Sequence, residues 1–357
     1  MKRLFIIPLI ALMAAACTKE DISVSGHENI PMRLYSNAVD SETSSSAGSA
    51  VFLFWDFGDI INNTAYPVPL VVCYPEESID DYARPNDPYN TGRLYPDGNR
   101  RALANGYAPS LLIPATVTVD GEERTDYENL TIPENSLCET DVLTSVQPIV
   151  GSASLPFDRN GGEPLEFMHA CSKVIINAKL AGDMTRFIRH VRISPHKSMV
   201  ANRMKWDRDE SFYRAEAVWN DSDADYPCVL GQPEDADQLT AQITSDVCQA
   251  YVTPRMVEMP VEITVERSEN VQFIDSKEVT FNAILGFDID RDGNNPEDLD
   301  KSGNVKNSNT LYENEAYTFT LVFGEDGIEL TGRKCEWEAG GNIIIPIYPI
   351  LPEDETT

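Results

Sequence analysis

Apolar and polar residues alternate with a period of two over much of this sequence. The alternation is clearest in four stretches, 115–119, 174–180, 261–266 and 317–323. It predicts β-strands with one buried face and one solvated face. Asp120-Gly121 directly follows the first stretch and favours a tight hairpin turn. Two shorter, more continuously apolar runs, at 51–55 and 70–74, are also predicted to be strands.

Helix signals are weak by comparison. No long amphipathic stretch with caps occurs, and 23 Pro and 20 Gly punctuate the chain at loop spacing. We therefore expect an all-β fold of antiparallel strands, arranged in sheets that pack face to face. The length of 357 residues suggests two domains. Asp-Arg-Asn-Gly-Gly at 158–162 separates two sets of strands, which predicts domains at 30–158 and 159–357.

The N-terminus has the form of a signal peptide. Lys2 and Arg3 precede an apolar stretch, 4–16, that is shorter than the ~20 residues a membrane-spanning helix needs. Small residues then lead into Cys17, and this junction resembles a bacterial lipobox. We expect residues 1–16 to be removed, Cys17 to carry fatty acyl chains such as palmitate, and 17–29 to be a tether. An unlipidated secreted protein is the alternative, and it too is extracytoplasmic.

The residues after Cys17 refine the expected location. Thr18-Lys19-Glu20-Asp21 resembles the export signal that sends lipoproteins of certain Gram-negative gut and oral anaerobes to the outer face of the outer membrane. The alternative is a solvated, charged tether. We expect a cell-surface protein that is lipid-anchored in the outer membrane.

Charge narrows the range of partners. The chain has 28 Lys and Arg against 58 Asp and Glu, a formal net charge of −30. Nucleic acid binding requires a basic footprint, and anionic membrane surfaces attract basic segments, so both are disfavoured as partners. Divalent cations and basic protein surfaces remain.

Six cysteines follow Cys17, and none shows the Cys/His spacing of a zinc site. An oxidising compartment permits disulfides among them, with 15 possible pairings. Cys228 and Cys248 form the first pair to test, whereas Cys171 lies in an apolar strand pattern and is expected to be a buried thiol. The six are Cys73, Cys138, Cys171, Cys228, Cys248 and Cys335.

An acidic loop supplies the one candidate metal site. Asp288, Asp290 and Asp292 alternate and are followed by Gly293, a run similar to the start of a calcium-binding loop. Position twelve is Leu299 instead of a bidentate Glu, so completion of the site would need a different loop path. Asp298 and Asp300 are the further candidate ligands. A structural calcium ion is the hypothesis, and a solvated acidic loop is the alternative.

Catalytic motifs are absent from the sequence: it contains no G-x-S-x-G, HExxH, P-loop or G-x-G-x-x-G. His169 lies between Phe167 and Cys171 in a strand pattern and is expected to be a satisfied core histidine. Trp55 and Trp337 are expected to be core anchors, although a sugar-stacking platform among the four tryptophans is an alternative. We do not expect an enzyme.

Two parts of the sequence carry a recognisable pattern: residues 165–174, LEFMHACSKV, and a C-terminal set at 316–321, 328–330 and 337–340 that ends in a Trp and a Gly. The first resembles the L-x-F-x-H strand of the fimbrillin superfamily, and the second is similar to the closing strands of that family. Members of this superfamily are subunits of type V pili. The resemblance implies two tandem β-sandwich-like (transthyretin-like) domains.

The resemblance also implies a mechanism of assembly. Family stalk subunits travel as lipoproteins and lose the tether and first strand to an arginine-specific protease, and the open groove accepts the C-terminal strand of the next subunit. In this chain the expected first strand is 30–36. It contains Arg33, which is the only basic residue between Lys19 and Arg84. Arg33 is thus either the processing site or an ordinary strand arginine, and this departure from the family pattern favours a tip or minor subunit.

The C-terminal segment is the candidate donor strand. Residues 343–352 are apolar but interrupted by proline, which confines a strand to an edge. The candidate donor side chains are Ile343, Ile345, Ile347 and Ile350. A last strand folded back on its own domain is the alternative. We expect a structural and adhesive pilus subunit, and the competing hypothesis is a stand-alone surface lipoprotein that binds glycan or host protein.

Overall fold

The computed structural model describes sixteen stretches of the chain: 31–34, 49–56, 68–73, 89–95, 100–157, 165–182, 185–208, 215–219, 239–241, 245–257, 259–285, 291, 293–294, 296–300, 303–325 and 328–335. These residues form strands β1 to β19 and three short 3₁₀ turns, η3 (Glu134–Ser136), η4 (Lys197–Met199) and η5 (Pro296–Asp298), and they contain no α-helix. The all-β prediction is confirmed. Within this part of the chain no helix is long and apolar enough to cross a membrane.

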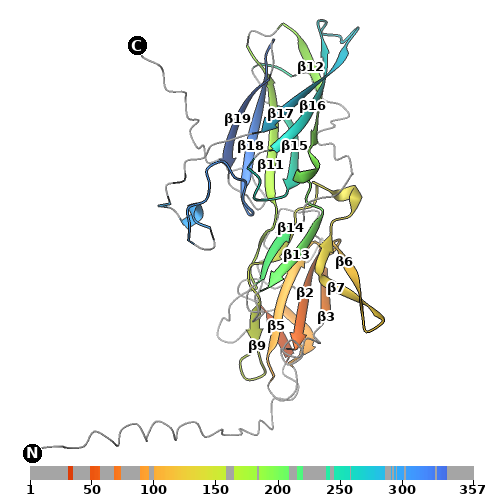
Figure 1. Ribbon diagram of the computed structural model, residues 1–357, viewed down its shortest axis with the longest axis vertical. Helices are drawn as coiled ribbons and strands as arrows, with labels where there is room; N and C mark the ends of the chain where they lie inside the picture. Colours follow the sequence, from red (N-terminus) through yellow and green to blue (C-terminus); the bar gives the residue numbers. More distant parts are fainter. Residues whose placement is uncertain are drawn as a thin grey trace, which may run out of the picture.

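Three sheets make up the lower half of the molecule in Figure 1. A six-stranded sheet has the order β10-β8-β5-β2-β3, with β9 also paired to β5, and comprises β2 (Ser49–Asp56), β3 (Val68–Cys73), β5 (Ala102–Ala108), β8 (Leu143–Ser145), β9 (Ile149–Gly151) and β10 (Phe167–His169). A four-stranded sheet has the order β14-β13-β7-β6 and comprises β6 (Ile113–Val119), β7 (Glu122–Thr131), β13 (Arg203–Arg208) and β14 (Ala215–Trp219). The third sheet pairs β1 (Pro31–Leu34) with β4 (Tyr89–Leu94).

Two sheets make up the upper half. One has the order β15-β11-β18-β19 and comprises β11 (Ser172–Leu180), β15 (Ser245–Val252), β18 (Ala316–Phe323) and β19 (Ile328–Cys335). The other has the order β12-β16-β17 and comprises β12 (Phe187–Pro195), β16 (Met259–Ser268) and β17 (Lys277–Leu285). The predicted hairpin at Asp120-Gly121 joins β6 to β7, and both residues adopt the positive φ that such a turn requires.

Face-to-face packing explains the sequence patterns. In β11 buried and half-buried residues alternate along all nine positions, because one face of the strand covers the core. In β2 the side chains of Val51 and Leu53 join the main core cluster, whereas those of Phe52 and Phe54 join a second cluster on the other face of the sheet. A strand buried on both faces reads as a continuous apolar run, as seen at 51–55.

The main core cluster extends through both halves of the molecule. In the lower half Tyr107 of β5 packs against Trp206 of β13, with 5.9 Å between ring centroids. In the upper half Phe281 of β17 packs edge-on against Phe323 of β18 at 6.4 Å. These contacts join the facing sheets of each half.

One strand pairing differs from the antiparallel expectation. β11 and β18 are parallel neighbours, in register from Lys173 with Ala316 to Leu180 with Phe323. Parallel pairing needs a long connection, and 135 residues lie between the two strands. Strand alternation in the sequence does not encode the direction of a neighbouring strand, so the pattern could not reveal this pairing.

Strands from both sides of the predicted boundary at 158/159 share sheets in the lower half. β10 pairs with β8, and β13 pairs with β7. Hydrogen bonding therefore connects the two sequence halves. The division into domains 30–158 and 159–357 stays a prediction.

Candidate functional site

The first strand, β1, is a short strand held by one neighbour. It is antiparallel to β4, with Pro31 opposite Leu94, Arg33 opposite Asn90 and Leu34 opposite Tyr89. The register shifts between Pro31 and Arg33, and among the described strands β4 is its sole partner. The predicted processing residue thus lies inside a hydrogen-bonded strand of four residues, so that strand must open before a protease can reach it.

Met32 anchors β1 in the second core cluster. Its side chain is 4% exposed and belongs to a cluster with Phe52, Phe54, Phe157 and Phe167, among others. The rings of Phe52 and Phe167 lie 6.1 Å apart in an edge-on arrangement. Removing β1 would therefore open the edge of β4 and an apolar pocket together.

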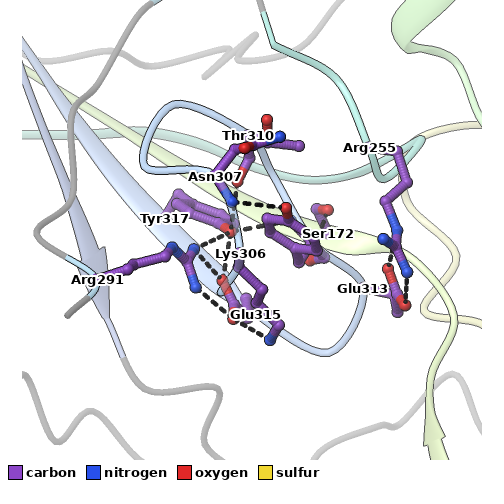
Figure 2. Close-up of polar contacts among 10 residues, drawn as sticks. Ser172, Arg255, Arg291, Lys306, Asn307, Thr310, Glu313, Glu315 and Tyr317 are labelled. Carbon is purple, nitrogen blue, oxygen red and sulfur yellow. Dashed lines mark hydrogen bonds and ion pairs between the residues drawn. The ribbon is translucent and has the colours of Figure 1, made fainter. Parts of the chain in front are cut away.

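A buried ion cluster forms at the start of β18 (Figure 2). The Arg291 guanidinium donates to both oxygens of Glu315, at 3.1 and 2.8 Å. Lys306 Nζ also donates to Glu315, at 2.7 Å, and the Tyr317 hydroxyl donates at 2.5 Å. The side chains of Arg291 and Glu315 are 1% and 6% exposed. One carboxylate thus gathers two cations and a phenol in a site closed to solvent.

The charges in this cluster are mutually dependent. Burial disfavours the charged guanidinium, but the hydrogen bonds and charge of Glu315 outweigh it and raise the pKa of Arg291. Burial, together with the Glu315 carboxylate, raises the pKa of Tyr317 well above its usual value. The phenol therefore stays protonated and donates, as the geometry requires. The cluster is a brace between the loop before β18 and the strand itself.

Arg291 belongs to the acidic run predicted to bind calcium. Asp288, Asp290 and Asp292 lie outside the described residues, whereas Asp298 and Asp300 lie within them. The Asp300 carboxylate accepts from the backbone N–H of Asn304 at 2.9 Å, which closes a local turn. Among the described residues no group of three or more His, Cys, Asp or Glu side chains is placed to hold a metal ion. The calcium hypothesis stays a prediction.

His169 lies at the end of β10, next to the crossover into β11. Its Nδ1 is 2.8 Å from a carboxylate oxygen of Asp141, and its backbone N–H donates to Asn314 Oδ1 at 3.2 Å. The Cys171 thiol is fully buried, and burial raises its pKa well above the usual value, with the nearby Asp141 carboxylate raising it further. A thiol in this state is a poor nucleophile. The contact between His169 and Asp141 joins the end of β10 to the segment just before β8.

The two halves of the molecule are tied together near this point. Trp219 of β14 donates from Nε1 to the carbonyl of Ala170 at 2.7 Å. Arg255, in the loop after β15, donates to both oxygens of Glu313 at 2.9 and 2.7 Å and lies 3.8 Å from Glu216 of β14. These contacts connect β14 of the lower half to loops of the upper half, so they stiffen the elongated molecule seen in Figure 1.

The remaining predicted residues are placed as follows. Cys138 and Cys171 are buried, as predicted for Cys171, and Cys248 lies half-buried in β15. Cys228, its suggested partner, lies outside the described residues, as do Cys17, Trp337 and the candidate donor residues Ile343, Ile345, Ile347 and Ile350.

Sequence patterns missed the partners of two polar groups. Glu315 follows 24 residues after Arg291, and Asp141 precedes His169 by 28. Neither separation corresponds to a local motif, so only the folded chain brings these groups together. The burial of Trp206 could have been predicted from the sequence, because Met204 and Trp206 alternate with the charged Arg203 and Lys205. Both apolar residues are buried in the structure.

This chain is similar to known proteins in structure but not detectably in sequence. No family model matches the chain, and no curated protein matches it by sequence. Solved structures that are similar include a candidate cell adhesion protein from Bacteroides uniformis, with 12% identity, a TM-score of 0.47, and coverage of 86% of this chain and 98% of that one. A fimbrial protein from Bacteroides vulgatus matches at 13% identity with a TM-score of 0.43 and the same coverages.

A third neighbour is the tip fimbrial protein Mfa3 from Porphyromonas gingivalis, with a C-terminal truncation. It matches at 12% identity and a TM-score of 0.36, over 86% of this chain and 98% of that one. The three neighbours named here are thus two fimbrial proteins and one candidate cell adhesion protein. At these TM-scores and identities the likeness assigns no function to this chain.

Proposed function

We propose that this chain is a structural and adhesive subunit, at the tip or in a minor position, of a cell-surface pilus assembled by β-strand exchange. It travels as a lipoprotein anchored through Cys17 in the outer membrane. Its partners are other subunits of the same pilus and a surface receptor. The proposal rests on one observation: β1 is a four-residue strand, paired with β4, that carries Arg33 and buries Met32.

The physical argument for strand exchange starts from that arrangement. Short terminal strands with one partner open at low free-energy cost, so Arg33 becomes accessible to an arginine-specific protease. Cleavage after Arg33, followed by loss of the released segment, removes the Met32 side chain from the second core cluster and leaves the edge of β4 unpaired from Asn90 to Leu94, with Leu34 still opposite Tyr89. An apolar pocket beside an open strand edge selects an incoming strand with an apolar residue at the matching position. The C-terminal segment of another subunit, 343–352, supplies such a strand.

A protease assay tests the proposal. Purified chain lacking residues 1–16 is treated with an arginine-specific protease and run on an SDS gel without boiling. We expect a ladder of SDS-resistant oligomers, because an exchanged strand is part of each subunit's core. Boiling should collapse the ladder to one band.

Two variants control this assay. Arg33→Ala removes the cleavage site and should leave monomer, whereas Arg124→Ala, on β7 beyond the first strand, should leave the ladder intact. A persistent monomer in the wild type after confirmed cleavage at Arg33 would rule out strand exchange and favour the stand-alone binding lipoprotein.

We also propose a structural calcium ion in the acidic loop. The support is that described ends of this loop are held in place, by Arg291 on Glu315 and by the Lys306 N–H on the carbonyl of Asp298 at 2.7 Å. Loops held at both ends lose less entropy when a cation orders them. Calcium titration should release heat in the wild type and none in Asp290→Ala with Asp292→Ala. If calcium titration of the wild type releases no heat, the calcium hypothesis is wrong.

A further inference from the structure

The hairpin of β6 and β7 projects from the lower half of the molecule as a two-stranded ribbon (Figure 1). Residues 115–126 form this ribbon, because β13 pairs with β7 only at residues 129–131. One face of the ribbon carries an apolar row, Ala115, Val117 and Val119, which is half-buried and belongs to neither core cluster. A two-stranded hairpin by itself is marginally stable in water, so this ribbon gains stability from packing against another surface.

The β6 edge of the ribbon is open to strand addition. Among the described strands β7 alone pairs with β6, and residues 115–119 contain neither the charge nor the proline that commonly protects an edge. The two-residue turn makes Val119 and Glu122 a hydrogen-bonded pair. Val119 therefore turns its N–H toward β7, whereas Thr116 and Thr118 turn theirs to the free edge.

β17, in the upper half, is a second open edge. It ends the order β12-β16-β17, and of the strands that the structure describes only β16 pairs with it. Residues 279–285 carry no charge and no proline. The opposite edge of the same sheet, β12, contains Arg189, Arg192 and Pro195, residue types that discourage pairing. The sheet is therefore protected on one edge and unprotected on the other.

The hydrogen-bond pattern of this sheet determines which groups of β17 are available. The His196 N–H donates to the carbonyl of Pro260 at 3.0 Å, so even-numbered residues of β16 turn their backbone groups toward β12 and odd-numbered ones toward β17. Odd-numbered residues of β17 lie opposite odd-numbered residues of β16. The even-numbered residues of β17, among them Thr280 and Asn282, therefore turn their N–H groups to the free edge.

We propose that the ribbon of one copy of this chain adds to the β17 edge of a second copy, with β6 antiparallel to β17. The polar faces match in this arrangement. Residues that turn their backbone groups toward each other lie opposite one another, so Thr116 and Thr118 come opposite even-numbered residues such as Thr280 and Asn282. All four side chains are exposed, and they form one polar outer face.

The apolar faces match as well. Val279, Phe281 and Ala283 of β17 pack against the main core cluster but are only half-buried. Because side chains alternate along a strand, the apolar row of the ribbon falls on the same face as these three residues. A shift by one residue would place threonines there instead. Each half-covered apolar row thus covers the other.

Charge favours the antiparallel direction. Glu122 and Glu123 outweigh Arg124 at the tip of the ribbon. Lys277 and Arg267 lie opposite each other at the start of β17, and within the described part of the chain neither has an ion-pair partner. Antiparallel pairing brings the acidic tip to this basic pair, whereas parallel pairing would carry the tip to the uncharged end of β17.

The contact repeats from copy to copy. Each copy has one ribbon and one β17 edge, so the pairing is heterologous and leaves both surfaces available at the ends of a row. One added strand pair buries a small area, so two free copies associate weakly, and copies already held in a row associate more strongly. The contact differs from strand exchange at β1 and needs no cleavage at Arg33.

Sedimentation velocity of the uncleaved chain, from micromolar to millimolar concentration, tests this inference. We expect the wild type to form oligomers as its concentration rises. Thr118→Pro and Asn282→Pro each remove an N–H that faces a free edge, so each should weaken association at least about tenfold. Thr118→Ala and Asn282→Ala keep the N–H and should associate as the wild type does. Thermal midpoints verify that all four variants fold.

A mixture of the two proline variants tests the heterologous geometry. Thr118→Pro retains an intact β17 edge, and Asn282→Pro retains an intact ribbon. One contact between the two variants is therefore complete, so the mixture should form a dimer with the wild-type affinity and no larger species.

A second pair of variants leaves the backbone unchanged. Val117→Lys places a charge in the apolar row, so it should weaken association at least about tenfold. Thr118→Lys adds the same charge to the polar outer face and should not weaken association. These variants test the contact even where a proline variant does not fold.

Four results would overturn the inference. They are a wild type that stays monomeric at millimolar concentration, a loss of association in only one of the two folded proline variants, a mixture of these variants that stays monomeric, and equal association of Val117→Lys and Thr118→Lys. Loss in Thr118→Pro alone would mean pairing of two ribbons, and loss in Asn282→Pro alone would mean pairing of two β17 edges. Because Arg33 stays uncleaved throughout, failure here and failure of strand exchange are distinguishable.

Discussion

Glu315 lies at the centre of a buried group of charged and polar side chains. Its carboxylate accepts from Arg291, Lys306 and Tyr317 in a site with almost no solvent. Removing one partner of a buried ion pair leaves an uncompensated charge, which costs far more than the pair contributes in net terms. Loss of Glu315 should therefore cost more stability than loss of an exposed ion pair such as Arg124 with Glu122.

Glu315→Gln should lower the free energy of unfolding by about 3–5 kcal/mol, because Arg291 stays buried without a counter-charge. Glu313→Gln is the matched control. Glu313 pairs with Arg255, whose side chain is 46% exposed, so the loss should be about 0–1 kcal/mol. Urea denaturation measures both. Equal losses in the two variants would show that burial of the Arg291 pair carries no special cost.

Glu266 gives the protein a defined acid sensitivity. Hydrogen bonds from Arg189 and then Ser276 lower its pKa from 4.5 to about 2. Because the folded-state pKa lies below the unfolded one, the unfolded state takes up the proton first as pH falls. The stability from this carboxylate is therefore complete above about pH 4.5 and is lost between about 4.5 and 2.

The destabilisation caused by Glu266→Gln should accordingly be largest above pH 4.5 and shrink toward zero near pH 2. Thermal midpoints of the wild type and the variant, measured from pH 6 to pH 2, give this difference. Glu262→Gln removes an exposed carboxylate from the same strand and should have a small effect throughout. A difference between wild type and Glu266→Gln that grows as pH falls would contradict the assignment.

Residue-level prediction from the sequence succeeded where a local pattern decides the outcome. Cys171 is buried as its strand pattern indicates, and His169 is held by a hydrogen bond near the core. The partner of Arg291, Glu315, could not be predicted from the sequence. The D-x-D-x-D-G run points to carboxylates around a cation, whereas the fold uses its single arginine to neutralise a distant glutamate.

At the scale of elements, alternation predicted β11, β16 and β18, because each covers a core with one face. It also predicted β6, whose residues are only half-buried or exposed. The parallel neighbour of β11 was not predictable, since side-chain alternation is the same beside a parallel or an antiparallel strand. Short strands such as β8, β9 and β10 were missed as separate elements because three residues are too few to show a period.

Close packing at β5 gives an element-scale prediction. A Cβ atom added at Gly106 would lie 2.7 Å from the Phe167 ring and 3.0 Å from the Val51 carbonyl oxygen. Gly106→Ala should therefore destabilise the protein by about 1–3 kcal/mol through overpacking. Gly182→Ala, where a Cβ meets no atom within 4 Å, is the control and should be near neutral. Urea midpoints compare the two, and equal midpoints would contradict the packing of β10 on β5 and β2.

At the scale of the whole molecule, paired sheets stand end to end, and the contacts of Trp219 and Arg255 tie the two halves. The leader and the L-x-F-x-H resemblance are sequence features, and they suffice to predict a surface pilus subunit. The partner of β1 is evident only from the folded chain, because β4 lies some 55 residues further along.

The N-terminal sequence of subunits within an assembled oligomer tests the central claim most directly. Edman sequencing of an SDS-resistant band should begin at Leu34, with Pro31, Met32 and Arg33 removed, because assembly requires the place of β1 to be vacated. Oligomers whose subunits still begin at Cys17, with β1 intact, would contradict strand exchange at this position.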